Sequence, residues 1–287
     1  MEHLQTQKAQ AFFDTLKEIA QETPGRASLI IAHKGEKSLQ IAAKQPMRVC
    51  SMSKMVVGLA FARKAAKDPA FAGKKVLLSA VNDLPTKHFD GPNHAAWQET
   101  LKGAPEATME QIAEGMLKYS SNRCTNYFLN TLGQEHINAI IQEYGLSMQQ
   151  FGTELTNLQG STLDMVNLSQ KIQKEPRSVS EMMRKIAPVE LRSSENISAF
   201  GFAKGGSDYR ITAGKKFEDI CFMWHAKNTN GCFIVNDVLP ETKKLLETNM
   251  IEFMCESVHN RGFLNKCRSA LSWQEFIRAG CNALRHL

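Results

Sequence analysis

The segment Arg48-Val49-Cys50-Ser51-Met52-Ser53-Lys54-Met55-Val56-Val57-Gly58-Leu59-Ala60 places a serine three residues before a lysine at the start of an apolar helical pattern. If the helix begins near Ser51, the hydroxyl and the Lys54 amine lie one turn apart on the same face. A lysine whose pKa is lowered can serve as the base that activates a serine nucleophile. This S-x-x-K pattern is weak on its own, because a serine capping a core helix beside a solvated lysine is the simpler explanation.

A hairpin precedes this segment, and a helix precedes the hairpin. Residues 28–33 and 38–43 have the composition of strands joined by the turn Lys34-Gly35-Glu36-Lys37. Residues 5–22 carry apolar side chains at helical spacing, and Pro24-Gly25 ends that helix. The helix that begins near Ser51 is expected to end at about residue 66.

Helical patterns dominate the middle of the chain, where strand signals are nearly absent between residues 69 and 188. Capping residues, apolar spacing and closing glycines predict helices over residues 108–117, 122–132, 135–144, 161–174 and 178–187. Strands are predicted again over residues 199–204, 219–225 and 232–235, with a hairpin loop at 227–231. A helix over residues 240–259 and a helical segment over 273–284 follow.

Strands near both ends of the chain with helices between them predict an α+β fold. We expect an α/β sandwich, in which an antiparallel sheet is flanked by the terminal helices, with an inserted all-α domain on one side. Residues 1–49 and 200–259 would form the discontinuous α/β domain, residues 50–199 the all-α domain, and residues 260–287 an extension of unknown role. A ligand site is expected in the cleft between the two domains.

Two further motifs follow the S-x-x-K segment in the chain. The first is Lys118-Tyr119-Ser120-Ser121-Asn122, where one predicted helix stops and the next begins, so that a serine here can be a simple cap. The second is Ala203-Lys204-Gly205-Gly206-Ser207 at the end of a predicted strand, where the glycines alone would suggest a bulge or bend. Neither motif is informative by itself.

In the order S-x-x-K, Y-S-x-N and K-G-G-S, the three motifs resemble those of the serine β-lactamases and penicillin-binding proteins, most closely the class A β-lactamases. These families carry S-x-x-K, S-D-N and K-T-G in the same order. The resemblance covers roughly residues 5–259, and it implies the β-lactamase/transpeptidase-like fold.

The resemblance also implies catalytic roles. Ser51 would be the acylated nucleophile, and Lys54 its base or proton relay. Ser120 would pass a proton to the departing nitrogen of an opened amide. Glu154 is the candidate base for the water that releases the acyl group, although an exposed loop carboxylate explains this residue as well.

The same resemblance implies how a substrate is held. Asn122 would bind the side-chain amide of the substrate, and Lys204 would keep the carboxylate site electropositive and help to lower the pKa of its neighbours. Gly206 and Ser207 belong to the strand that binds the substrate, and the backbone N–H groups of Ser51 and Ser207 would form the oxyanion hole.

The motifs depart from the class A pattern at several positions. Ser121 replaces the usual aspartate of the second motif, and Gly205 replaces the usual threonine of the third. The glutamate and asparagine of the E-x-x-x-N pattern stand only three residues apart, at Glu154 and Asn157. Without a positioned base, the acyl-enzyme would persist, as it does in a penicillin-binding protein.

Cys50 is a further position at which this chain can be compared with the class A enzymes. In related carbapenem-hydrolysing enzymes this position is sometimes bridged to a cysteine shortly after the third motif. Asp208 and Tyr209 occupy that region here, so we expect no such disulfide.

Composition excludes several other function classes. The formal net charge of +6 comes without any run of five basic residues, so we expect no binding to nucleic acid or to anionic membranes. No apolar run approaches the roughly 20 residues that a membrane span requires. The seven cysteines are scattered without a C-x-x-C pair, which favours free thiols and argues against a zinc site. We expect no metal and no cofactor.

The sequence therefore predicts a monomeric serine hydrolase that acts on a small-molecule amide or β-lactam substrate. The alternatives are a D-alanyl carboxypeptidase that binds penicillin, a glutaminase-like amidase, and a non-catalytic binding module on the same scaffold. Residues 1–8 lack the apolar region of a secretory signal, so a cytoplasmic location is expected, or a periplasmic or secreted one if a presequence was removed.

Overall fold

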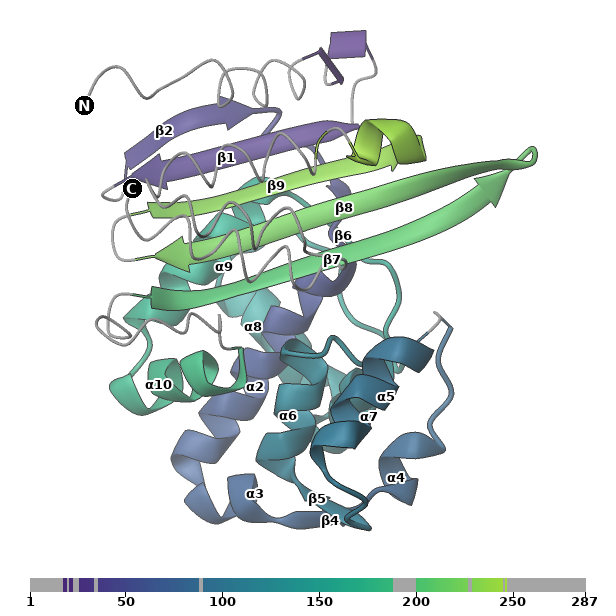
Figure 1. Ribbon diagram of the computed structural model, residues 1–287. Coiled ribbons are helices and arrows are strands. Elements are labelled where there is room, and N and C mark those ends of the chain that lie inside the picture. The colour runs from purple at the N-terminus through teal and green to yellow at the C-terminus, as the bar shows by residue number, and fades with distance from the viewer. Residues whose placement is uncertain are drawn as a thin grey trace, which may run out of the picture.

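A five-stranded antiparallel sheet lies against one group of helices in the computed structural model, which describes residues 18–19, 21–22, 26–33, 36–87, 90–187, 200–226, 229–244 and 246 (Figure 1). The strands are β1 (Ala27–His33), β2 (Glu36–Ile41), β7 (Phe200–Thr212), β8 (Lys215–Ala226) and β9 (Thr229–Val238). Their spatial order is β2-β1-β9-β8-β7. The predicted α+β class and the two predicted hairpins are confirmed.

The pairing of β1 with β9 joins segments that lie about two hundred residues apart in the chain. Leu29 stands opposite Phe233 in this ladder, and both side chains are buried. The apolar residues of these strands form part of the core because a sheet buries its apolar face against another layer. This long-range pair holds the two ends of the helical region beside each other.

The helical layer is built around α2 (Lys54–Lys67), which follows directly after the short 3-10 turn η2 (Cys50–Ser53). Helix α2 is buried over most of its length and contacts α6, α7, α8 and α10. A Cβ atom added at Gly58 would lie 2.6 Å from Leu117 Cδ1, so this position allows α2 and the end of α6 to approach closely. The other helices are α3 (Pro69–Gly73), α4 (Ser79–Asn82), α5 (Gly91–Thr100), α6 (Met109–Leu117), α7 (Asn122–Leu132), α8 (Gln134–Glu143), α9 (Thr162–Lys174) and α10 (Arg177–Ile186).

Capping residues explain where several of these helices begin. Thr108 and Gln111 form a capping box at α6, and Ser161 and Asp164 form another at α9. Helix α9 packs against β1, β8 and β9, while α10 contacts β7, so the helices cover one face of the sheet (Figure 1). No helix in the described part of the chain is both long and apolar enough to cross a membrane.

The expectation that residues 69–188 contain helices alone is wrong in detail. Two small ladders lie within or against this region: β4 (Lys75–Leu77) pairs with β5 (Glu106–Thr108), and β3 (Met47–Arg48) pairs with β6 (Gln159–Gly160). Strands of two or three residues are too short to produce a recognisable alternation of apolar and polar side chains. The β3–β6 ladder matters most, because it directly precedes residues 50–53, which contain the predicted nucleophile Ser51 and are therefore named the nucleophile turn.

The sequence suggested that the K-G-G-S segment ends a strand, but the strand continues beyond it. Strand β7 continues to Thr212, and its pairing with β8 is regular from Lys204 onward, with the only shift at residues 200–202. The two strands turn at Ala213 and Gly214, whose φ angles of 49° and 74° suit a two-residue hairpin. The far end of β7 has only two apolar residues, Tyr209 and Ile211, and it follows two glycines that suggested a bend, so sequence analysis missed it.

Three predictions fall wholly or largely outside the described residues, namely the helices over 5–22, 240–259 and 273–284. The proposed extension over residues 260–287 also lies outside them. The division between an α/β domain and an all-α domain at residues 49/50 and 199/200 stays a prediction.

Candidate active site

Ser51 lies in the turn η2 and lines a pocket of about 570 Å³ together with Ser120 and Asn122. The preceding residue, Cys50, has a φ angle of 45°, a left-handed conformation that is costly for a residue with a side chain. Ser51 is partly exposed, and its hydroxyl has no hydrogen-bond partner among the described residues. The serine of the S-x-x-K motif therefore faces a cavity, which a simple helix cap would not require.

The Lys54 side chain is fully buried, and its amine points at the second motif. Its Nζ donates to Ser120 O at 2.5 Å and to Asn122 Oδ1 at 2.6 Å, and lies 3.3 Å from Ser120 Oγ. A solvated lysine, the simple explanation of the pattern, is therefore wrong for this residue. The first two motifs of the sequence meet here although they are separated by more than sixty residues.

The third motif meets the second at the Ser120 hydroxyl. Lys204 Nζ donates to Ser120 Oγ at 2.9 Å, and the Lys204 side chain is almost completely buried. Ser120 Oγ thus lies between two lysine amines, one from α2 and one from β7. Ser120 has a φ angle of 61°, so the nucleophile turn and the second motif both contain a residue in a strained left-handed conformation.

Burial lowers the pKa of both lysines. Desolvation, with the positive charge of Lys204 as a second cause, holds the pKa of Lys54 well below its ordinary value, although the charge of Asp90 opposes this. Desolvation likewise lowers the pKa of Lys204 to about 8. A neutral amine donates two N–H groups and keeps a lone pair, so Lys54 can hold Ser120 O and Asn122 Oδ1 and still accept a proton.

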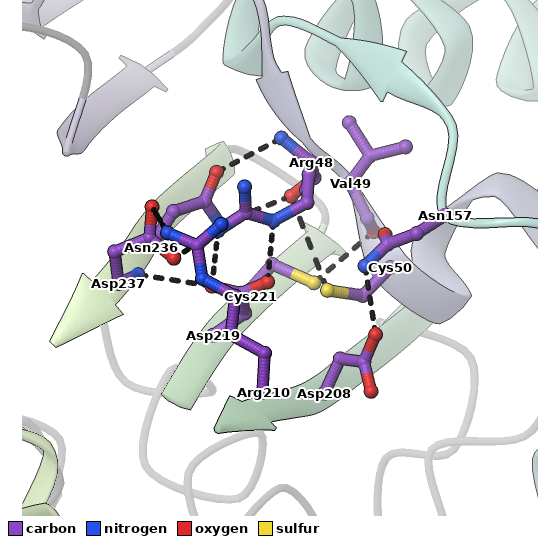
Figure 2. Close-up of polar contacts among 10 residues, drawn as sticks. All are labelled: Arg48, Val49, Cys50, Asn157, Asp208, Arg210, Asp219, Cys221, Asn236 and Asp237. Carbon is purple, nitrogen blue, oxygen red and sulfur yellow. Dashed lines mark hydrogen bonds and ion pairs between the residues drawn. The ribbon is translucent and has the colours of Figure 1, made fainter. Parts of the chain in front are cut away.

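A network of charged side chains fixes the segment that leads into the nucleophile turn (Figure 2). Arg48 donates to Asp219 Oδ2 at 2.7 Å and Oδ1 at 2.8 Å, and also to Asp237. Its backbone N–H donates to Asn236 Oδ1 at 2.9 Å. Because Asp219 is on β8 and Asn236 and Asp237 are on β9, these contacts attach the segment before the nucleophile turn to the sheet.

Two thiols lie side by side where the nucleophile turn meets β8. Figure 2 shows the sulfur of Cys50 beside that of Cys221 on β8, and Cys221 donates to Val49 O at 3.1 Å. The interaction with Cys221, together with burial, raises the pKa of Cys50 well above its usual value. Both residues are present as thiols, and the pairing of Cys50 with residues just after the third motif is not observed.

The loop after α8 forms another wall of the pocket. Asn157 lines the pocket and donates through Nδ2 to Asp208 Oδ2 at 2.9 Å, while its buried Oδ1 accepts from no donor in the part of the chain that the structure describes. Glu154 is paired with Lys87 at 3.4 Å and is about one-third exposed. Lys87 lines the pocket, whereas Glu154 does not. The structure therefore brings Asn157 to the site and places Glu154 at its margin.

The remaining motif residues are placed by the backbone of β7. Gly206 stands opposite Cys221, and Ser207 stands opposite Ile220, in the regular part of the ladder. Strand β7 packs against η2, so the backbone of the third motif runs beside the nucleophile turn. The assignment of substrate-binding roles to Gly206 and Ser207 stays a prediction.

Sequence analysis did not single out Asp90 or His94, which lie directly beneath the second motif. Both are buried, and both contact Ser121. No motif surrounds them in the sequence, so no local signal would have indicated their position. Among the described residues, no group of three or more histidine, cysteine, aspartate or glutamate side chains is arranged to hold a metal ion.

Comparison with known proteins identifies the family and the fold. Residues 11–200 match the model of the β-lactamase enzyme family. A β-lactamase from Chitinophaga pinensis DSM 2588 is similar in structure, with a TM-score of 0.62 and 13% identity over 82% of this chain and 95% of that chain. A class A β-lactamase from Bacteroides cellulosilyticus DSM 14838 gives a TM-score of 0.57 and 10% identity over 85% of this chain and 99% of that chain.

A mutant of PBP-A, solved as an acyl-enzyme complex with penicillin G, gives a TM-score of 0.53 and 17% identity over 84% of this chain and 93% of that chain. A search of curated proteins gave no significant match. At such identities the solved structures show the β-lactamase/transpeptidase-like fold alone. The family model covers more than half of the sequence, and from this match and the shared fold we conclude that the chain belongs to the β-lactamase enzyme family.

Proposed function

We propose that this protein is a serine hydrolase that forms an acyl-enzyme at Ser51 and hydrolyses an amide, with β-lactams as the default substrate class. The observation that carries this proposal is the position of Ser120 Oγ, held between the buried amines of Lys54 and Lys204 beside a pocket that Ser51 lines. Binding alone does not require a nucleophile, a base and a proton relay at one place. The non-catalytic alternative is therefore not favoured.

In the proposed acylation step, Ser51 Oγ bonds to the carbonyl carbon of the amide while its proton passes to the Lys54 amine. The C–N bond then breaks, and the leaving nitrogen takes the proton of the Ser120 hydroxyl. Ser120 regains a proton from Lys54, whose Nζ lies 3.3 Å from Ser120 Oγ. This transfer is favourable because desolvation and the neighbouring charge of Lys204 lower the pKa of Lys54.

Substrate binding is assigned to the same three motifs. Asn122 accepts from Lys54 through Oδ1, which leaves its NH₂ group as a donor for a carbonyl of the substrate side chain. Lys204 donates to Ser120 and is almost fully buried, so its charge acts on a substrate carboxylate across a short distance of protein. The backbone N–H groups of Ser51 and Ser207 are the proposed oxyanion hole.

Deacylation is assigned to the loop that contains Glu154 and Asn157. Glu154 is the proposed base for the attacking water, and the buried Oδ1 of Asn157 is a suitable acceptor for that water. The ion pair between Glu154 and Lys87 competes with this role, and we therefore expect deacylation to be slower than acylation. Because the ion pair between Glu154 and Lys87 would slow deacylation, it favours a penicillin-binding D-alanyl carboxypeptidase as the second candidate function.

The test is incubation with a fluorescent penicillin, followed by intact-protein mass spectrometry. We expect a covalent adduct that maps to Ser51, forms quickly and disappears slowly. The Ser51→Ala variant should form none, and Ser161→Ala, which removes a hydroxyl from the capping box of α9, serves as a control that should be acylated normally. Absence of both an adduct and any hydrolysis of the penicillin by the native protein would exclude the β-lactam proposal and direct attention to small acyclic amides.

A further inference from the structure

Asp90 places a buried carboxylate at the N-terminus of α7, the helix that starts with the second motif. Asp90 Oδ1 accepts from the backbone N–H of Asn122 at 2.8 Å, and Oδ2 accepts from the backbone N–H of Arg123 at 2.9 Å. Oδ2 also accepts from the Ser121 hydroxyl at 3.1 Å and lies 4.0 Å from Arg123 Nη1. The carboxylate therefore satisfies donors that a helix N-terminus otherwise leaves unpaired.

The position of Asp90 in the chain makes this arrangement unusual. Asp90 directly precedes α5, but its side chain makes no capping bond to that helix. It caps α7 instead, a helix that begins thirty-two residues later. A negative charge at this end of a helix is also favoured by the helix dipole.

His94, in the first turn of α5, supports the same cluster. His94 Nδ1 lies 2.8 Å from Ser121 Oγ, and Nε2 lies 2.9 Å from Asn82 Oδ1. Ser121 Oγ in turn accepts from the backbone N–H of Cys124 at 3.2 Å. The Asp90 carboxylate, the Ser121 hydroxyl and both ring nitrogens of His94 are thus partnered, whereas the buried Arg123 Nε has no hydrogen-bond partner among the described residues. Such a connected cluster favours one backbone conformation.

The second motif needs this support because Ser120 is strained. A φ angle of 61° at a serine costs of the order of 1–3 kcal/mol, and the surrounding contacts have to hold it in place. Asn122 and Ser120 both bind the Lys54 amine, so a small displacement of this backbone moves two of its partners. The class A pattern has an aspartate inside this motif, where the present chain has Ser121.

We propose that Asp90, buttressed by His94, is a positioning residue that supplies from a separate segment the carboxylate that the second motif lacks. Asp90 acts through the backbone of Asn122 and Arg123 and through Ser121, and it sets the geometry in which Ser120 and Asn122 meet Lys54. This inference rests on the proposed function for its kinetic consequence. Its structural consequence is independent of any substrate.

A second consequence follows from the charge of Asp90. Three charged or titratable groups act on Lys54: Lys204 on β7, Cys124 on α7, and Asp90, which precedes α5. Asp90 raises the pKa of Lys54. Removing this charge while keeping the shape of the side chain, as in Asp90→Asn, should lower the pKa of Lys54 further. A residue with a purely structural role would not produce this shift.

The experiment moves the carboxylate from one segment to the other. Acylation by a fluorescent penicillin is timed for the native protein, Asp90→Asn, Ser121→Asp and the double variant that carries both changes. We expect Asp90→Asn to acylate about tenfold to a hundredfold more slowly, as misplaced catalytic groups usually do. Ser121→Asp alone should also be impaired, because two carboxylates would share one buried site.

The double variant is the decisive case. It should acylate at least about tenfold faster than Asp90→Asn, or fold where Asp90→Asn does not, because the carboxylate is again present beside the motif. A double variant no better than Asp90→Asn, or an Asp90→Asn protein that acylates at the native rate, would overturn the proposal.

The matched control is Asp164→Asn, which changes a buried aspartate that accepts from Ser147 N at 2.8 Å and caps α9 away from the pocket. This variant should lose thermal stability and keep the native acylation rate. An equal loss of rate in Asp164→Asn would show a general stability effect and contradict a positioning role.

A measurement without substrate separates this inference from the proposed function. The titration of Lys54 is followed by NMR of lysine-labelled protein, with Lys54→Met to assign the signal. The pKa of Lys54 should fall in Asp90→Asn and stay unchanged in Asp164→Asn. If penicillin never acylates the native protein, the proposed function fails, and this titration still decides the inference: an unchanged Lys54 in Asp90→Asn refutes it.

Discussion

The two walls of the pocket differ in how their polar groups are partnered. On the acylation side, the buried amines of Lys54 and Lys204 both bind the Ser120 hydroxyl, and Ser120 lines the pocket. On the side of the 151–158 loop, Asn157 is bound to Asp208, and Glu154 is paired with Lys87 at the rim. In the first wall the proposed catalytic groups bind one another through Ser120, whereas in the second the polar groups are bound to charged side chains outside the proposed machinery.

This difference indicates which half of the reaction is better supported. Acylation needs a base, a proton relay and donors for the oxyanion, and the first wall holds the groups proposed for the first two tasks at hydrogen-bonding distances. Hydrolysis of the acyl-enzyme needs a base aimed at a water, and the proposed base, Glu154, forms an ion pair with Lys87. We therefore expect fast acylation followed by slow release, and each of the following predictions tests one wall against the other.

The largest effect is expected for Lys54→Met. This change removes the proposed base while keeping an apolar stem of similar length, so the acylation rate should fall by about 10²–10⁴-fold. The rate is measured by stopped-flow fluorescence with a labelled penicillin. Lys67→Met, at the exposed end of the same helix, should acylate like the native protein. An unchanged rate in Lys54→Met would remove Lys54 from the mechanism.

The next effect concerns the opposite wall. Glu154→Gln should leave acylation intact and prolong the acyl-enzyme by roughly a hundredfold, because the proposed base for water is lost. Turnover of a chromogenic cephalosporin and the decay of the adduct mass report this step. Glu143→Gln removes another ion-paired surface glutamate and should change neither rate. Equal turnover by Glu154→Gln and the native protein would show that Glu154 is not the base.

A smaller effect is expected on the pH dependence of acylation. The neutral Lys54 amine is the reactive form, so the rate should rise with pH as Lys54 loses its proton. The charge of Lys204 lowers the pKa of Lys54, so Lys204→Met should move this rise to higher pH. The profile is measured between pH 5 and about 9, and Lys174→Met, an exposed lysine on α9, should not move it. A shift to lower pH would contradict the assigned coupling.

The smallest expected effect is on stability, and it tests the burial of Lys204 alone. The pKa of Lys204 is about 8 in the folded protein and 10.5 when unperturbed. Between these values the unfolded chain binds more protons, so the free energy of unfolding should rise with pH across this window, by about 3 kcal/mol at most. Lys204→Met should flatten this rise in urea unfolding measured at several pH values. A rise of the same size in that variant would show that other groups cause it.

The helices could be predicted from the sequence because their signals are local. Thr108, Ser121 and Ser161 cap α6, α7 and α9, and each was recognisable from the residues that follow it. The far half of β7 was not recognised, since Gly205 and Gly206 suggested a bend and the alternation of Tyr209 and Ile211 with polar residues is short. Short ladders such as that of β3 with β6 also depend on pairing with a distant segment.

Parts of the candidate site could likewise be predicted from the sequence, and other parts could not. The three motifs were visible in the chain, and the structure brings Ser51, Lys54, Ser120, Asn122 and Lys204 to one region. The spacing of Glu154 and Asn157 indicated a departure from the E-x-x-x-N pattern but did not reveal the pairing of Glu154 with Lys87. Asp90 was invisible, because its partners lie more than thirty residues away and a lone aspartate before a helix normally signals only a cap.

The sequence by itself determined the order of the motifs, the one-turn spacing between Ser51 and Lys54, and the alternation of sheet and helical regions. These properties follow from helix and strand periodicity, which is a property of neighbouring residues. Only the tertiary structure decided that Ser120 Oγ lies between two lysines and that a distant carboxylate caps its helix. The physical reason is that these contacts are selected by the packing and the polar satisfaction of the whole buried interior, which no single stretch of sequence encodes.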